Sequence, residues 1–325
     1  MNKYKQLTRE QRYQIHAYKK TGMSQVKIAL LVEVSQSSIS RELKRNTGAR
    51  GYRANQADAK AKQRKKNTIR AYVMIPSTVA EITEKIKENW SPEQISGWLK
   101  KSPEIPISVS HETIYKFIWA DKKKGGKLYL FLRRKAKKYN ARCKDKQAGR
   151  GFIKDRVGIE DRPPIINERG RVGDWEIDLV IGKGHSGALV TIVERVTRYT
   201  VTMRVFDKSA RTVTDATIAL LKPFKDSVLS ITADNGKEFA YHKEVSKALD
   251  CDYFFADPYC SWQRGLNENT NGLLRQYWPK STNFKLILDE DVDRNLIQLN
   301  NRPRKMLLFK APFEMMEKHL RGLAA

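Results

Sequence analysis

The stretch of sequence that decides the fold is Asp174-Trp175-Glu176-Ile177-Asp178-Leu179-Val180-Ile181. A period of two divides it into an apolar face, formed by Trp175, Ile177, Leu179 and Ile181, and a face of carboxylates, formed by Asp174, Glu176 and Asp178. This alternation is typical of a half-buried β-strand. The stretch therefore predicts a strand that carries three acids on its second side.

The residues that follow predict a mixed sheet with helices. A glycine-rich turn at 182–187 separates the first strand from strands at 188–193, 199–206, 228–233 and 253–256, and helices are expected at 212–222, 238–249 and 266–277. Three strands in a meander, followed by alternating helices and strands, is the order of a ribonuclease-H-like sheet. We therefore expect an α/β domain of this class at 173–325, with further helices at its C-terminal end.

Three acids in this order of elements predict a metal site. In a ribonuclease-H-like sheet the first and fourth strands are neighbours, so Asp178 converges with Asp234 after the fourth strand, and Glu268 at a helix start supplies a third carboxylate. Two divalent cations about 3.5 to 4 Å apart keep such carboxylates ionised and activate a water for attack at phosphorus. The pattern leaves open whether Asp178 or its neighbours Asp174 and Glu176 provide the first ligand. The stretch 234–236 is also suited to a simple turn.

Residues 1–52 predict a helix-turn-helix domain. Thr8 and Gln11 fit a capping box that opens a first helix, Ser24 opens a short second helix, and residues 36–45 form a third after a tight break. In the helix-turn-helix geometry this last helix enters the major groove of DNA. Its candidate DNA-binding residues are Gln36, Ser37, Ser38, Arg41, Lys44 and Arg45. An ordinary small helical bundle is the alternative.

Charge is distributed unevenly along the chain. Of the formal net charge of +27, residues 1–172 carry +25 and residues 173–325 carry +2. With 40% hydrophobic residues the chain is no disordered polycation, and concentrated basic charge is typical of segments that neutralise phosphates. We expect a basic linker at 53–76 and a basic linker or arm at 121–172. Between them, residues 77–120 predict a second helical domain, either another helix-turn-helix or a packing or dimerisation bundle.

Several other classes of protein are disfavoured. No apolar run approaches the ~18 to 20 residues that span a bilayer, and the first residues lack a secretory signal, so a cytoplasmic protein is expected. Cys143, Cys251 and Cys260 lack the spacing of a disulfide framework or a structural zinc site, and we expect reduced thiols. His185, in the glycine-rich turn, is either an exposed loop residue or a DNA contact.

Three motifs resemble those of a known enzyme family. Residues 234–239 match the DNGxEF signature of integrase-like DDE enzymes, and residues 175–178 are similar to their WxxD motif. Residues 258–269 read PYCSWQRGLNEN and resemble the PYxSWQRGxNEN block of bacterial insertion-sequence transposases of the thirty family. The 33 residues between Asp234 and Glu268 agree with that family, and the resemblance extends over nearly the whole chain.

The resemblance implies a DNA transposase in which Asp178, Asp234 and Glu268 form a metal-binding catalytic triad, and it selects Asp178 among the acids of the first strand. It implies two Mg²⁺ ions, for which Mn²⁺ can substitute, that promote strand cleavage at terminal inverted repeats and strand transfer to target DNA. A homodimer or larger homo-oligomer on double-stranded DNA is implied, because two element ends must be brought together. Residues implied to support the metal ligands or to contact DNA are Asn235, Gln263, Asn267, Arg264 and Arg275.

Two other functions remain open on the sequence. A helix-turn-helix transcriptional regulator with a C-terminal ligand-binding or dimerisation domain explains the uneven charge but not the three acids. A ribonuclease-H-type nuclease that acts on RNA in hybrids explains the acids but leaves the DNA-reading helices without a use.

Overall fold

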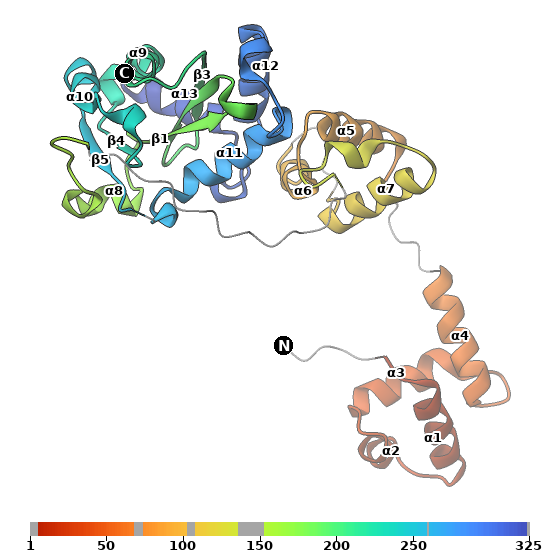
Figure 1. Cartoon of the computed structure of the whole chain (residues 1–325). Helices are drawn as coiled ribbons and strands as arrows, with labels where there is room; N and C mark the ends of the chain where they lie inside the picture. The colour runs from red at the N-terminus through yellow and green to blue at the C-terminus, as the bar shows by residue number, and fades with distance from the viewer. Residues whose placement is uncertain (1–5, 68–73, 103–107, 136–152, 259, 324–325) are drawn as a thin grey trace. The chain divides into compact units, whose positions relative to one another are not determined.

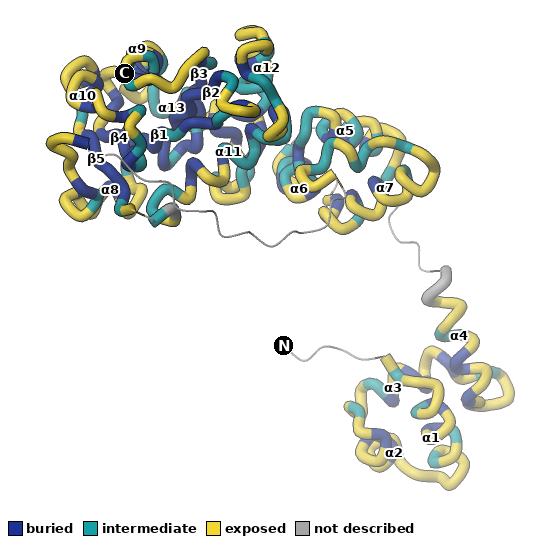
Figure 2. Tube along the Cα trace, in the orientation of Figure 1, coloured by how far each residue is buried: buried dark blue, intermediate teal, exposed yellow. Residues whose placement is uncertain are grey.

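The computed structural model describes residues 6–67, 74–102, 108–135, 153–258 and 260–323. The chain divides into two compact units, Met1–Tyr72 and Val73–Ala325 (Figure 1). Each unit has buried apolar clusters of its own, which appear as dark segments inside exposed helices and loops (Figure 2). The two units are described separately below.

The N-terminal unit is helical over its described residues. It contains α1 (Arg9–Lys20), α2 (Gln25–Leu31), α3 (Gln36–Asn46) and α4 (Ala54–Asn67). The predicted caps are present: Thr8 forms a capping box with Gln11, and the Ser24 side chain accepts a bond from the first turn of α2. Ser35, which the sequence placed in the break before α3, caps that helix in the same way. Ile15, Ile28, Ile39 and Leu43 meet in one core. The helix-turn-helix predicted for residues 1–52 therefore rests on a buried apolar cluster.

Helix α4 corrects the expected basic linker at 53–76. It packs against α1 and α3, with Ala57 fully buried and Asp58 joined to Arg12 in a buried ion pair. Small alanines make this contact, so the apolar signal in the sequence is weak and the basic residues on the other positions dominate it. Residues 68–73 of the expected linker lie outside the described residues.

The second unit begins with a helical segment that has its own core. Helices α5 (Pro76–Lys87), α6 (Pro92–Leu99) and α7 (His111–Lys123) bury Ile82, Ile86, Ile95, Ile114 and Ile118 among other residues. Part of the expected arm at 121–172 belongs to folded structure. A short 3₁₀ turn at Leu128–Phe131 packs onto α5 and α7, and α8 (Pro164–Glu168) buries Ile166. These parts of the expected arm fold because apolar residues lie between the basic ones. Residues 136–152 of the arm lie outside the described residues.

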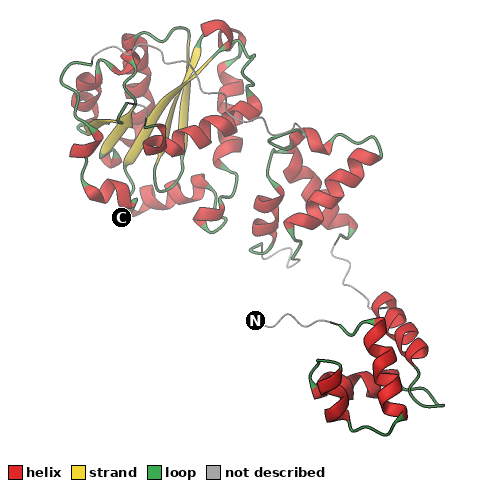
Figure 3. Ribbon diagram, turned by 60° about the horizontal axis from the view of Figure 1, so that its bottom comes forward, coloured by secondary structure: helices red, strands yellow, loops and turns green. Residues whose placement is uncertain are grey.

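The C-terminal part of this unit is a ribonuclease-H-like α/β domain, which confirms the predicted fold class. Its strands are β1 (Asp174–Ile181), β2 (Ala188–Glu194), β3 (Thr200–Val205), β4 (Ser230–Ala233) and β5 (Asp252–Phe255), in the order β3-β2-β1-β4-β5. Pairing is antiparallel for β1–β2 and β2–β3 and parallel for β1–β4 and β4–β5. The helices are α9 (Ala210–Leu221), α10 (His242–Leu249), α11 (Gly265–Tyr277), α12 (Asp289–Asn300) and α13 (Pro312–Leu323), and they flank the sheet (Figure 3).

Strand β1 is covered on both faces, which corrects the expectation of a half-buried strand. Trp175, Ile177 and Leu179 join the larger core with residues of α9, α10 and α13, while Val180 joins a second core with residues of α11 and α12. Two of the three acids are therefore removed from solvent, because Asp174 and Glu176 are buried. Carboxylates in such a place need partners, because unpaired buried charge is costly.

Candidate active site

Two acids from different strands meet where β1 and β4 separate. The parallel pairing of these strands ends with Glu176 opposite Thr232, and Asp178 and Asp234 lie just beyond that point. Both carboxylates face the guanidinium of Arg264: Nη2 is 3.0 Å from Asp234 Oδ2, and Nη1 is 3.7 Å from Asp178 Oδ1. The structure thus brings two of the three candidate ligands together.

The third candidate, Glu268, lies in the first turn of α11, a helix that packs against β1 and β2. Within the described part of the chain, no group of three His, Cys, Asp or Glu side chains is close enough to hold a metal ion. The described residues therefore bring Asp178 and Asp234 together on one arginine, and they do not place a third His, Cys, Asp or Glu in one group with this pair. The role of Glu268 stays a prediction.

The carboxylate of Asp178 is oriented by neighbours that the sequence analysis did not find. Its Oδ1 accepts the backbone N–H of Leu179 at 2.9 Å, and its Oδ2 accepts the side-chain amide of Asn271 at 2.9 Å. The Thr191 hydroxyl, on the β2 residue opposite Asp178, is 3.0 Å from Asn271 Oδ1. The one available signal was spacing, because Asn271 follows Glu268 by three residues and so shares its helix face.

The electrostatics of the site disfavour a second negative charge. Burial raises the pKa of Asp178 to about 6; Arg264 opposes this rise, and the nearby charges of Asp234 and Glu238 add to it. The repulsion between the Asp178 and Asp234 carboxylates would therefore favour the binding of a cation between them.

Asp234 is fixed by the turn that follows β4. Its Oδ1 accepts the backbone N–H of Gly236 at 2.8 Å, which is the local turn chemistry recognised in the sequence. The next residue, Asn235, is buried and donates to the carbonyl of Ala256 at 2.6 Å, and Arg156 donates to its side-chain oxygen. Asn235 therefore ties this turn to the end of β5.

None of the three other candidates, Gln263, Asn267 and Arg275, is seen bonded to Asp178 or Asp234 among the described residues. Gln263 bonds twice to Asp257, to the backbone N–H at 2.7 Å and to the carboxylate at 2.8 Å. The backbone N–H of Asn267 donates to the Glu176 carboxylate at 3.3 Å, and the buried side-chain N and O of Asn267 have no hydrogen-bond partner in the described part of the chain. Arg275 donates to the carbonyl of Ile181 at 2.7 Å. These contacts position the loop before α11 and the helix itself.

The other acids of β1 are engaged elsewhere. Asp174 accepts from Arg171 at 3.0 Å and from the Ser230 hydroxyl at 2.6 Å. Glu176 forms an ion pair with Arg195 at 2.9 Å and has no solvent exposure. Asp178 is therefore the acid of this strand whose carboxylate remains partly open, with a side chain that is 26% exposed.

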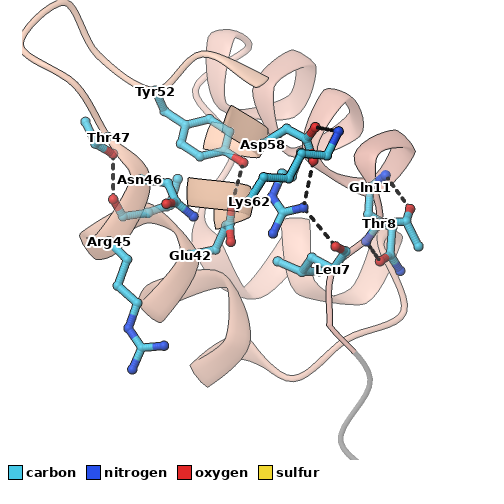
Figure 4. Close-up of polar contacts among 12 residues, drawn as sticks. Leu7, Thr8, Gln11, Glu42, Arg45, Asn46, Thr47, Tyr52, Asp58 and Lys62 are labelled. Atoms are coloured by element: carbon cyan, nitrogen blue, oxygen red, sulfur yellow. Dashed lines mark hydrogen bonds and ion pairs between the residues drawn. The ribbon is translucent and has the colours of Figure 1, made fainter. Parts of the chain in front are cut away.

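The candidate DNA-reading residues lie on the open side of α3. Gln36, Ser37, Arg41, Lys44 and Arg45 are exposed and Ser38 is half-buried. In Figure 4 the Arg45 side chain points away from the buried Glu42 and Tyr52 side chains. The Arg41 guanidinium folds back onto Ser37, to the carbonyl at 3.0 Å and the hydroxyl at 3.2 Å. The helix thus presents polar and basic groups on one face and its core contacts on the other.

The remaining predictions concern isolated residues. His185 is exposed and has a positive φ of 61°, in a short 3₁₀ turn, and its contact with DNA stays a prediction. Cys251 and Cys260 are free thiols, whereas Cys143 lies outside the described residues. Among the described residues, none of the helices has the length and apolar character needed to cross a bilayer.

The donor set suits a hard divalent cation. Oxygen ligands from carboxylates are those that Mg²⁺ prefers, and Asp178 and Asp234 already face a cationic group, the Arg264 guanidinium. A ribonuclease-H-like sheet with an aspartate pair at this position, in one chain with a helix-turn-helix, defines the class of integrase-like polynucleotidyl transferases.

Comparison with known proteins gives the family. A model described as a helix-turn-helix domain matches residues 3–46, and a model of the integrase core domain matches residues 170–261. The chain is 43% identical over 312 residues to the transposase for insertion sequence element IS4351 of Bacteroides fragilis, covering 95% of both chains. It is 38% identical over 331 residues to transposase InsI for IS30C of Escherichia coli (strain K12), covering 98% of this chain and 84% of the relative. The chain belongs to the IS30 family of insertion-sequence transposases, and it is a DNA-binding DDE polynucleotidyl transferase.

Solved structures with similarity to this chain include the catalytic core domain of BIV integrase. It is 17% identical in sequence, has a TM-score of 0.38, and is matched over 99% of its own length and 47% of this chain.

Proposed function

We propose that this transposase recognises the terminal inverted repeats of its element through α3 and cuts and joins DNA strands at a site formed by Asp178, Asp234 and Glu268. The observation that carries the proposal is the convergence of the two aspartates on one cationic group at the point where β1 and β4 separate. When bound there, two Mg²⁺ ions would neutralise charge on the reacting phosphodiester and lower the pKa of a water.

The chain's own contribution is to hold the oxygens in place. The amide of Asn271 and the backbone N–H of Leu179 fix the plane of the Asp178 carboxylate, and the N–H of Gly236 fixes Asp234. Oxygens that are already oriented lose little freedom when a cation binds, which supports tighter binding. Asn271 therefore acts as a positioning residue in this proposal.

End recognition is assigned to the N-terminal unit. The exposed face of α3 offers amide, hydroxyl and guanidinium groups, which bond to base edges in a major groove. Residues 1–172 also hold nearly all the net positive charge, so binding should weaken steeply with salt. We infer a dimer or larger assembly on DNA, because two element ends must be joined by one reaction.

The test uses the wild-type chain and a duplex with the inverted repeat found beside the gene. We expect Mg²⁺-dependent strand cleavage that is lost in Asp234→Asn. The matched control is Asp252→Asn, an exposed aspartate on β5 that is remote in sequence from the aspartate pair and should leave cleavage unchanged. Tight metal-independent binding without any cleavage would instead favour the regulator, and equal activity of Asp234→Asn would refute the assigned site.

A further inference from the structure

The side chain of Arg264 occupies the centre of the candidate metal site. It was expected to contact DNA or support the ligands, and the structure places it against both aspartates, 3.0 Å from Asp234 and 3.7 Å from Asp178. Its Nη1 also donates to the carbonyl of Ile177 at 3.0 Å. The guanidinium therefore has two hydrogen-bond acceptors and a second carboxylate nearby, and the Arg264 side chain is only 11% exposed.

This position is built into the local fold. The carbonyl of Ile177 is free to accept because β4 no longer runs beside β1 at this residue. Gln263, the preceding residue, is fixed by its two bonds to Asp257, which hold the turn that carries Arg264. The arginine is thus directed at the aspartates by structure on both sides of it.

The guanidinium takes the oxygens that a metal would need. Asp234 uses Oδ1 for the N–H of Gly236, so Oδ2 is the atom left for a ligand, and that atom is bound to Arg264. Asp178 uses Oδ2 for Asn271, and its Oδ1 faces Leu179 and Arg264. A cation that binds Asp234 through Oδ2 must compete with the guanidinium for that oxygen, and the two positive charges repel each other.

We propose that Arg264 is the counter-cation of the metal-free site: it holds Asp178 and Asp234 together in the absence of metal and is displaced from them when a divalent cation binds. The inference rests on the proposed metal site. It makes Arg264 a positioning residue that weakens metal binding while it keeps the empty site assembled. Once displaced, its guanidinium is a free donor beside the reacting phosphate.

The first experiment measures Mn²⁺ binding to the full-length protein by isothermal titration calorimetry, without DNA. We expect Arg264→Gln to bind Mn²⁺ about tenfold more tightly than wild type, because no competing cation has to leave; tenfold is 1.4 kcal/mol, near the strength of one hydrogen bond to a charged group. Arg264→Lys keeps the charge and should bind close to wild type. Arg204→Gln is the matched control, since it also removes an arginine of low exposure, 13%, that bonds to an acid and a backbone carbonyl, Asp289 at 2.8 Å and Ile287 at 2.7 Å, and neither of these is in the proposed metal site.

The second experiment follows the arginine itself. A dicarbonyl reagent that modifies guanidinium groups is applied with and without MgCl₂, and modified peptides are quantified by mass spectrometry. Modification of Arg264 should rise several-fold with Mg²⁺, whereas that of Arg204 should not change. This readout separates displacement of the side chain from a general effect of removing one positive charge.

The outcomes distinguish this inference from the proposed function. If wild type binds no Mn²⁺, or if Asp234→Asn binds it equally well, the metal site itself is wrong and the inference fails with it. If Asp234→Asn abolishes binding but Arg264→Gln binds no more tightly than Arg204→Gln, only the counter-cation is refuted. Unchanged modification of Arg264 in Mg²⁺ also refutes it.

Discussion

Replacing Arg12 should destabilise the DNA-reading unit more than any exposed arginine. Arg12 is 10% exposed and reaches Glu42 at 2.9 Å, Asp58 at 3.3 Å and the carbonyl of Leu7 at 2.9 Å. These contacts join α1 to α3, α4 and the residue before the capping box, and Figure 4 shows Glu42 and Tyr52 beside Asp58 and Lys62. A methionine of similar length would fill the space but leave the acids without their cation.

The expected loss follows from what each acid retains. Among the described residues Glu42, 7% exposed, would keep the hydroxyl of Tyr52 at 3.1 Å, whereas Asp58 would keep the cation of Lys62 at 2.8 Å. Removing one partner of a buried ion pair costs about 3 to 5 kcal/mol, and the retained Lys62 pair places Arg12→Met near the lower value. A unit of about 70 residues has roughly 4 to 10 kcal/mol of stability, so most of it would be lost.

Native-state hydrogen exchange of the full-length protein is the assay, because peptides around Ile15 and Leu43 report the opening of this unit alone. Glu42→Gln keeps a hydrogen-bonding group and should cost less, about 1 to 2 kcal/mol. Arg41→Met removes an exposed arginine and should change stability by about 0.5 kcal/mol at most. A loss below about 1 kcal/mol for Arg12→Met would refute the reasoning, and so would equal losses for Arg12→Met and Arg41→Met.

Three further predictions concern the catalytic domain. Burial raises the pKa of Asp178 from 3.8 to about 6, so the folded state holds this proton more tightly than the unfolded state does. Without metal, the free energy of unfolding should therefore fall by about 1 to 3 kcal/mol as the pH rises from 3.8 to about 6. Urea denaturation should show this loss in wild type but not in Asp178→Asn. Asn271→Ala removes the amide that orients Asp178 and should lower the strand-cleavage rate about 10- to 100-fold with an unchanged melting temperature. Gly173→Ala should cost about 2 to 4 kcal/mol in urea denaturation, since φ is +120° and the added Cβ would lie 2.4 Å from the carbonyl of Ser227, whereas Gly170→Ala meets nothing within 4 Å.

Periodicity predicted the sheet well because each strand has a strong apolar signal. The strands expected at 188–193 and 199–206 lie at Ala188–Glu194 and Thr200–Val205. The same method failed for α4, where the buried residues are alanines and an aspartate, and for the ends of the expected arm, where few apolar residues stand among many basic ones. In both places the many basic residues outweighed the apolar signal in the sequence. Lysines on the exposed face of a helix do not prevent its opposite face from being buried.

The candidate site was predicted only in part, for a different physical reason. Asp178 lies within β1 and Asp234 directly follows β4, two strands that the order of elements makes neighbours, and local motifs mark both residues. Asn271 and Thr191 are 80 residues apart and meet only because α11 packs on β2, which no pattern within either segment reveals. The contact of Arg264 with both aspartates is likewise a product of the folded loop, although the motif itself drew attention to this residue.

The three acids of β1 show why the site lies where it does. Where β4 still runs alongside, Asp174 and Glu176 are sealed and neutralised by Arg171 and Arg195. Beyond the end of β4, the carboxyl end of β1 has no strand beside it on that edge. The side chain of Arg264 and solvent reach this edge instead, and Asp178 is the first acid of β1 there. In any strand with an acid at every second position, the first acid beyond the end of the adjacent strand would have a solvent-accessible carboxylate. The length of β4, rather than the acidic pattern of β1, therefore selects which acid can act, and extending the pairing by two residues would bury Asp178 as Glu176 is buried.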